Sequence, residues 1–387
     1  MSALPDPELI EALRQTVRAL CRDFPPAYWR GLDRAKAYPT DFVAAMTRAG
    51  LLGVLIPEEY GGGGLGLTVA AAILEEVHAS GGNAAALHAQ MYTMGTVLRH
   101  GSAAQKETWL PRIADGSIRL QAFGVTEPTA GTDTTSISTF ARREGDTYVI
   151  NGQKVWTSRA EHSDLMVLLA RTTPKEQVAR KADGLSVFLV DMRAAKGNGL
   201  TIKPIATMLN HATTEVFFDN LVIPADSLIG EEGKGFRYIL DGMNAERILI
   251  GAECLGDAAW LIGKARDYAS SRVVFGRPIG QNQGVQFPIA RAYAQTHAAR
   301  LTIQDAARYD AGLPCGEQAN IGKMLASEAS WAAADMCLQT HGGFGFAEEY
   351  DIERKFRETR LYQVAPISTN LILAYVAEHV LGLPRSY

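Results

Sequence analysis

An acid and a base stand side by side in an otherwise mostly apolar segment of this sequence. Residues 241–252 read DGMNAERILIGA, in which Glu246 and Arg247 are followed directly by Ile, Leu and Ile. Carboxylate and guanidinium groups are seldom buried unless they are paired or have a chemical task. The structural interpretation is an ion pair at a contact between helices, and the chemical interpretation is a buried reactive group.

Four other segments carry residue types that suit phosphate groups or flat rings. Hydroxyl groups crowd residues 124–136 (GVTEPTAGTDTTS), and residues 154–158 (KVWTS) place Trp156 beside two further hydroxyls. Residues 272–283 (RVVFGRPIGQNQ) combine a guanidinium, an aromatic ring and an amide. A glycine turn in residues 339–358 (QTHGGFGFAEEYDIERKFRE) would let backbone N–H groups approach a pyrophosphate. Each segment alone is also typical of a polar loop, and a lone tryptophan in a strand more often belongs to the core.

The elements that must position these residues follow from hydrophobic periodicity. Residues 1–118 have apolar side chains at helical spacing, and residues 231–387 again show long helical patterns. Residues 119–230 contain short runs rich in Val, Leu, Thr and Phe, separated by turn-forming residues, which indicates antiparallel strands. We therefore expect an α+β protein with an N-terminal helical domain, a middle β domain and a C-terminal helical bundle at these boundaries.

Composition argues against several classes of function. The chain has 387 residues and a net charge of −4 without a basic stripe, which disfavours a nucleic-acid partner. Its 4 cysteines are dispersed and its 8 histidines lack ligand spacing, so we expect neither a disulfide framework nor a metal site. The N-terminus mixes acidic residues through an amphipathic pattern, which predicts no signal peptide, no membrane insertion and a cytoplasmic location.

In their order along the chain, these segments resemble the acyl-CoA dehydrogenase family. Two family patterns are met position by position: G-V-T-E-x-x-A-G-T-D-x-x-S at 124–136, and Q-x-x-G-G-x-G-F-x-x-E-x-x-x-x-R-x-x-x-E at 339–358. With PEEYGG at 57–62, the resemblance covers nearly the whole chain. It implies the helical–β–helical acyl-CoA dehydrogenase fold, a tightly bound FAD, and a homotetramer built as a dimer of dimers. It also implies a fatty acyl-type thioester of coenzyme A as substrate.

The resemblance assigns individual residues to FAD and to coenzyme A. The flavin end of FAD would contact Val125, Thr126, Trp156, Ser158, Ser368 and Asn370. The pyrophosphate and adenosine end would contact Arg272, Phe275, Gln283 and, from a neighbouring subunit, Gln339 and Gly343. Thr132 would lie near coenzyme A. The resemblance therefore predicts an FAD that bridges two subunits.

The resemblance also gives the acid–base pair a role. Many family members take their catalytic base from a Tyr-Glu-Gly-Thr stretch near the C-terminus, but this chain has Ala-Pro-Ile-Ser at 365–368. A branch that includes isovaleryl-CoA and long-chain acyl-CoA dehydrogenases takes the base from the first long helix after the β domain. That position corresponds to Glu246, 26 residues before Arg272, with Arg247 ordering its surroundings. A base for a weakly acidic thioester α-proton must be buried, because burial raises its pKa.

Pro366 departs from the family pattern at a position that matters for the reaction. Family members commonly bind the thioester oxygen with the flavin ribityl 2′-hydroxyl and with the backbone N–H at this position, and proline has no N–H. Losing one such donor costs roughly 2.7–4 kcal/mol in other enzymes. Either a shifted loop presents the N–H of Ile367, or the reaction is slower or different.

Three functions are compatible with the sequence. The first is FAD-dependent α,β-dehydrogenation of an acyl-CoA, with electrons leaving through an electron-transferring flavoprotein. The second keeps the fold and the flavin but changes the chemistry, as in flavin-dependent oxidases, monooxygenases or desulfinases. The third is a protein that binds FAD or acyl-CoA without turnover. The acyl chain length and branching do not follow from the sequence.

Overall fold

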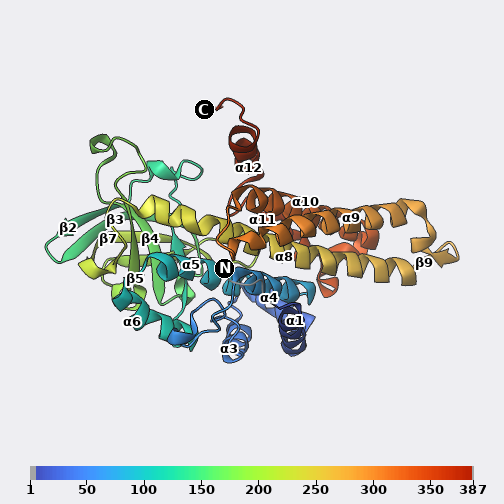
Figure 1. Ribbon diagram of the computed structural model, residues 1–387. Helices are drawn as coiled ribbons and strands as arrows, with labels where there is room; N and C mark the ends of the chain where they lie inside the picture. The colour runs from blue at the N-terminus through green and yellow to red at the C-terminus, as the bar shows by residue number, and fades with distance from the viewer. Residues whose placement is uncertain (1–5, 386–387) are drawn as a thin grey trace. The chain divides into compact units, whose positions relative to one another are not determined.

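The computed structural model describes residues 6–385, except for the side chains of residues 306 and 307. The chain forms two compact units (Figure 1). We call Lys36–Gly64 with Ala85–Met243 the β unit, and Met1–Ala35 with Leu65–Ala84 and Asn244–Tyr387 the helical unit. The division into three domains at residues 118 and 230 remains a prediction.

The β unit is built on a sheet with helices α3 (Thr40–Arg48), α5 (Ala85–His100) and α6 (Ala103–Ala114). The strands are β1 (Leu120–Gly124), β2 (Phe140–Glu144), β3 (Thr147–Ser158), β4 (Leu165–Arg171), β5 (Leu185–Asp191), β6 (Leu200–Pro204), β7 (Thr213–Pro224) and β8 (Leu228–Ile229). Their order is β6-β7-β3-β2-β4-β5-β8, and β1 pairs with β4. The sheet therefore confirms the expected middle β region.

Most strand pairs are antiparallel, as the sequence predicted, but β4 also has parallel neighbours. Strands β3 and β7, β4 and β5, and β6 and β7 pair antiparallel. Strand β1 runs parallel to β4, with Leu120 opposite Leu165, and β2 meets β4 in parallel where Phe140 faces Arg171. Parallel neighbours cannot be joined by a tight hairpin. The chain accordingly passes through β2 and β3 between β1 and β4.

Strand β4 lies at the centre of the core of the β unit. Every residue of β4 is buried. Successive side chains of a strand point to opposite faces of the sheet. The side chains of β4 accordingly alternate between two hydrophobic clusters: Leu165, Val167 and Leu169 in one, and Met166, Leu168 and Ala170 in the other. Burial on both faces explains why the segment is continuously apolar.

The helical unit contains α1 (Pro7–Cys21), α2 (Pro26–Ala35), α4 (Leu67–Ala79), most of α8 (Gly235–Ser271), α9 (Gln283–Asp305), α10 (Gly316–His341), α11 (Ile352–Leu361) and α12 (Thr369–Tyr375). A short hairpin of β9 (Val273–Val274) and β10 (Arg277–Pro278) follows α8. Small side chains such as Ala258 of α8 and Ala333 of α10 join one buried cluster. Alanine at such positions lets helices approach closely, because it fills little volume.

Buried charges join α4, α8 and α11 inside the helical unit. Asp257 Oδ1 lies 2.9 Å from His78 Nδ1 and 2.6 Å from Lys355 Nζ. Glu358 Oε2 lies 3.1 Å from Lys355 Nζ, and Glu358 Oε1 accepts from Arg354 Nη1 at 2.9 Å. We call these five residues the buried charge cluster. Each cation in it faces at least one carboxylate, which offsets the cost of taking the charges out of water.

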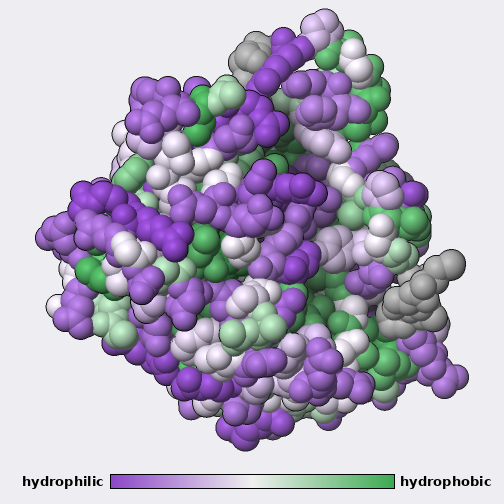
Figure 2. All heavy atoms as spheres, turned by 60° about the vertical axis from the view of Figure 1, so that its left-hand side comes forward, coloured by the Kyte–Doolittle hydropathy of each residue, from purple (hydrophilic) through white to green (hydrophobic). Residues whose placement is uncertain are grey.

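Within residues 6–385, no helix is both long and apolar enough to cross a bilayer. The face shown in Figure 2 is largely hydrophilic, with small hydrophobic patches between polar side chains.

Candidate active site

Glu246 lies in the part of α8 that belongs to the helical unit. It is buried, with 8% of the residue exposed. The neighbouring Arg247 is partly buried and donates from Nη1 to Asn244 Oδ1 at 2.8 Å. Burial lowers the pKa of Arg247, and the negative charge of Glu246 opposes this shift. The guanidinium is thus held by the amide of Asn244 beside the acid.

Groups from α10 and α12 lie close to this part of α8. Gly316 begins α10, and a Cβ at that position would lie 2.9 Å from Tyr375 Oη and 3.9 Å from Asn244 Nδ2. Glycine at 316 therefore leaves room for the Tyr375 hydroxyl near the residues that flank the acid–base pair.

The segment that would carry the base in many family members contains no acid in this chain. It joins α11 to α12, and we call residues 362–368 the linking segment. Pro366 is exposed, whereas Ile367 is buried and its N–H has no hydrogen-bond partner among the described residues. The Ile367 carbonyl accepts from Lys323 Nζ of α10 at 2.7 Å, and the same ammonium binds the carbonyl of Tyr362. The linking segment is thus fixed at both ends by one lysine.

The end of α12 that follows the linking segment carries two of the predicted flavin contacts. Ser368 caps α12, since its Oγ accepts from the N–H of Leu371 at 3.3 Å. Asn370 is exposed in the first turn of this helix. Their role toward FAD remains a prediction.

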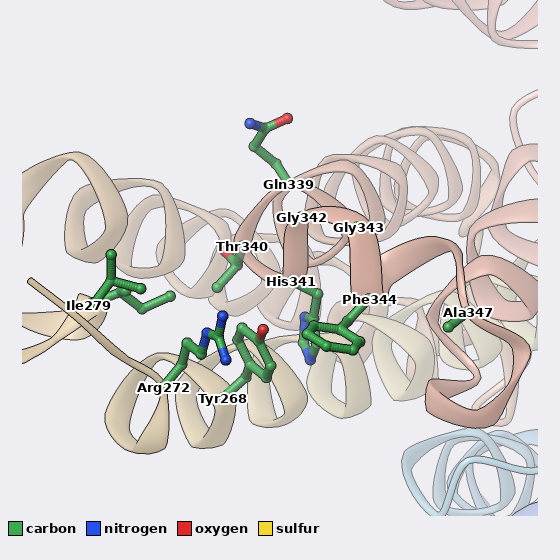
Figure 3. Close-up of a pocket in the computed structure, with 11 residues that line it drawn as sticks. Tyr268, Arg272, Ile279, Gln339, Thr340, His341, Gly342, Gly343, Phe344 and Ala347 are labelled. Atoms are coloured by element: carbon green, nitrogen blue, oxygen red, sulfur yellow. The ribbon is translucent and has the colours of Figure 1, made fainter.

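A pocket of about 610 Å³ lies between the C-terminal end of α8 and the glycine turn after α10. Its lining includes Tyr268, Arg272, Gln339, His341, Gly343 and Phe344. Figure 3 shows the side chains of Arg272, Tyr268, His341 and Phe344 pointing toward one another, whereas Gln339 points away from them. The Arg272 guanidinium lies 5.8 Å from the centroid of the Phe344 ring.

This pocket suits a ligand that has phosphate groups and a flat ring. Arg272 offers a planar, permanently charged donor for phosphate. His341 and Tyr268 stack with ring centroids 4.2 Å apart. A Cβ built on Gly342 or Gly343 would meet no protein atom within 4 Å. A side chain at either glycine would therefore project into open space, which the turn leaves free for a ligand.

Some of the residues that the sequence assigned to the adenosine end of FAD lie together in the folded chain. Arg272, Gln339 and Gly343 line the same pocket of a single chain. The contribution of Gln339 and Gly343 from a neighbouring subunit, to an FAD that bridges two subunits, remains a prediction. Phe275 and Gln283 are exposed and lie outside the pocket lining.

Trp156 is the predicted residue of the β unit whose position differs most from that of an ordinary core residue. Instead of packing in the core, it is 59% exposed, and its backbone has a φ of +60°, next to a register shift between Lys154 and Thr157 of β3. A positive φ is uncommon for a residue other than glycine. The backbone N–H of Val155 donates to the Thr126 carbonyl at 2.9 Å, so the two predicted flavin-binding segments lie side by side. Val125, Thr126 and Ser158 are partly buried beside them.

A buried ion pair supports this arrangement, and its role was not predicted. Lys154 Nζ donates to Glu127 Oε1 at 2.8 Å and to the Val125 carbonyl at 2.9 Å. Burial alone would raise the pKa of Glu127, but the charge of Lys154 and hydrogen bonds, including one from the Ser138 N–H, lower it to about 2. Burial lowers the pKa of Lys154 to about 8 despite its partner. The only sign of this ion pair in the sequence was the presence of a lysine in KVWTS and a glutamate in GVTEP.

Thr132 lies on an exposed loop between β1 and β2. The buried Arg171 at the end of β4 holds this loop, because it donates to the Thr135 carbonyl at 2.7 Å and to the Ile137 carbonyl at 3.3 Å. The position of Thr132 relative to coenzyme A remains a prediction. Across the described part of the chain, no cluster of three or more His, Cys, Asp or Glu residues could hold a metal ion.

Comparisons with known proteins identify the family. Models of the N-terminal, middle and C-terminal domains of acyl-CoA dehydrogenase match residues 7–117, 122–221 and 233–381. The acyl-CoA dehydrogenase FadE12 of Mycobacterium tuberculosis (strain ATCC 25618 / H37Rv) is 35% identical over 381 residues, which cover 97% of each chain.

Solved structures share the same fold. A glutaryl-CoA dehydrogenase from Mycobacterium smegmatis in complex with FADH2 is 25% identical with a TM-score of 0.89, and the match covers 99% of this chain and 97% of that one. A chain solved in work on the electron transferring flavoprotein of Acidaminococcus fermentans is 28% identical with a TM-score of 0.90, covering 98% and 99% of the two chains. The chain described here therefore belongs to the acyl-CoA dehydrogenase family of oxidoreductases, and its cofactor is FAD.

Proposed function

We propose that this protein catalyses the α,β-dehydrogenation of an acyl-CoA thioester to the 2-enoyl-CoA, with Glu246 as the base that accepts the α-proton. The observation that carries the proposal is the burial of Glu246 in α8, together with the absence of an acid from residues 365–368. Burial disfavours the ionised form of a carboxylate and so makes it a stronger base. Arg247, fixed by Asn244, would order the surroundings of the base.

The remaining predicted residues would hold FAD and align the substrate. The exposed Trp156, with Thr126 and Ser158, would contact the flavin, and the pocket at Arg272 and Gly343 would hold the pyrophosphate and adenosine part. Phe275, Gln283, Gln339, Ser368 and Asn370 would complete these contacts, and Thr132 would contact coenzyme A. When bound, FAD supplies the acceptor for the β-hydride. Alignment of a substrate between base and acceptor lowers the barrier by removing the entropy cost of bringing them together.

The thioester oxygen needs hydrogen-bond donors, because negative charge develops on it as the α-proton leaves. Pro366 cannot donate, but the adjacent Ile367 has an N–H without a partner among the described residues. We propose that the Ile367 N–H replaces the donor that Pro366 lacks. The carbonyl of Ile367 is already fixed by Lys323, so the backbone on both sides of this residue is constrained.

Further proposals concern partners and assembly. The solved relative from work on an electron transferring flavoprotein supports a protein of that kind as electron acceptor. The family resemblance supports a homotetramer, built as a dimer of dimers, and a cytoplasmic location. The helical region to residue 118, the β region to residue 230 and the C-terminal helical bundle remain our proposed domains.

An anaerobic screen of acyl-CoA esters tests the proposed reaction. The FAD-loaded protein is mixed separately with butyryl-CoA, isovaleryl-CoA, an aromatic acyl-CoA and octanoyl-CoA. The flavin absorbance near 450 nm is followed. Loss of absorbance with at least one saturated ester, and formation of the matching enoyl-CoA, is the expected result. No bleaching with any ester would instead support a binding protein without turnover. Oxygen consumption that accompanies turnover in air would indicate an oxidase or monooxygenase.

A further inference from the structure

Lys323 is a fully buried lysine whose ammonium group binds main-chain carbonyls. It lies on α10, with 0% of the residue exposed. Its Nζ donates to the carbonyls of Tyr362 and Ile367, which lie 39 and 44 residues further along the chain. These carbonyls lie at the start and near the end of the linking segment. One cation therefore ties two points of this segment to the same position on α10.

The ammonium of Lys323 has no carboxylate partner of its own. Among the described residues, no Asp or Glu oxygen forms a salt bridge with its Nζ. An unpaired charge in a protein interior is costly, because carbonyl dipoles replace the water shell only in part. Retaining a lysine at this position is therefore expected to serve a purpose that an apolar side chain cannot serve.

Lys323 also lies within electrostatic reach of the proposed base. The negative charge of Glu246 favours the protonated form of Lys323, and the positive charge of Arg247 disfavours it. Burial is the largest influence and lowers the pKa of Lys323 to about 8. Lys323 thus interacts electrostatically with Glu246 while its ammonium binds the linking segment.

We infer that Lys323 is a positioning residue for the dehydrogenation: it fixes the linking segment so that the Ile367 N–H is held in place for the thioester oxygen. This inference rests on the proposed function. Fixed donors stabilise a developing oxyanion better than mobile ones, since they need no reorganisation during the reaction. Because Pro366 has no N–H, stabilisation of the thioester oxygen depends more strongly on the orientation of the Ile367 N–H.

The experiment compares Lys323→Met, which keeps the side-chain length without the donors, with Lys323→Arg, which keeps charge and donors. Amide hydrogen exchange is measured on the FAD-loaded proteins without substrate, in peptides that cover residues 362–371 and residues 268–275. We expect faster exchange in 362–371 for Lys323→Met, unchanged exchange in 268–275, and a smaller effect for Lys323→Arg. Lys203→Met, a change of an exposed lysine in the β unit, is the control and should leave both regions unchanged.

Flavin reduction by the best of butyryl-, isovaleryl- and octanoyl-CoA is then measured at equal FAD content. We expect the limiting reduction rate of Lys323→Met to fall at least tenfold, with partial recovery in Lys323→Arg. Unchanged exchange in 362–371, or faster exchange with a normal reduction rate, would overturn the inference while leaving the proposed function intact. A wild-type protein that no ester reduces would overturn the proposed function itself.

If Lys323→Met does not fold, Lys323→Arg carries the test alone. Its exchange in residues 362–371 and its limiting reduction rate should then change together, because the bulkier guanidinium shifts the same two carbonyls. A change in exchange without a change in rate would contradict the inference.

Discussion

Two buried lysines of the helical unit have opposite surroundings. Lys355 belongs to the buried charge cluster, where Asp257 and Glu358 lie within 3.1 Å of its ammonium. Lys323 is equally buried, but its ammonium binds only the carbonyls of the linking segment. The first arrangement joins three helices through compensated charges, and we expect it to serve stability. In the second arrangement, an ammonium group without a bound carboxylate holds the backbone of the linking segment, and we expect it to serve the reaction.

The largest effect in this comparison is expected for Lys355→Met. The change leaves Asp257 and Glu358 buried with one cation fewer, and removing one partner of a buried ion pair typically costs about 3–5 kcal/mol. Denaturant unfolding of the FAD-loaded protein measures the loss. The control Lys203→Met, on an exposed side chain, should change stability by no more than about 0.5 kcal/mol. A loss below about 1 kcal/mol for Lys355→Met would show that the cluster is not a structural element.

The ion pair of the β unit combines features of Lys355 and Lys323, because the Lys154 ammonium binds both a carboxylate and a carbonyl. The pKa of Glu127 is about 2 in the folded protein and near its ordinary value of 4.5 in the unfolded chain. Its contribution to stability is therefore complete above pH 4.5 and is lost as the pH falls from 4.5 toward 2. Between pH 4.5 and pH 2, the free energy of unfolding of Glu127→Gln should therefore fall by about 3 kcal/mol less than that of the wild-type protein. An identical pH dependence in both proteins would contradict the assigned pair.

A smaller effect is expected at Pro366. If Ile367 donates from a segment that the proline ring holds rigid, Pro366→Ala should slow flavin reduction and lower stability by about 0.4–1 kcal/mol. If no donor has taken over, the restored N–H should instead speed reduction, by up to roughly 2.7–4 kcal/mol in barrier height. Anaerobic stopped-flow mixing with the best ester separates the two. We predict the slower enzyme; a faster one with unchanged substrate affinity would show that the oxyanion site lacks a donor.

The sequence predicted the order of helical and β regions because long periodic segments report directly on which face is buried. It singled out residues that line the pocket at the end of α8, because Arg272 and Gly343 lie in distinctive local patterns. It did not predict that one chain brings them together, since this depends on packing between α8 and α10.

Other features left no local signal. Trp156 has the sequence context of a core residue, and only the backbone turn at positive φ exposes it. Lys323 binds carbonyls 39 and 44 residues away, and a carbonyl is present at every position whatever the side chain. Partners of this kind become visible only in the folded chain.

The most direct test of the central claim is the rate of flavin reduction in Glu246→Gln. The change keeps the shape of the side chain but removes the base. With the best ester and at equal FAD content, we predict nearly unchanged acyl-CoA binding and a reduction rate lower by several orders of magnitude. Glu253→Gln, which changes another buried glutamate of α8, is the matched control and should reduce its flavin at a near-normal rate. Near-normal reduction by Glu246→Gln would contradict the account and place the base elsewhere.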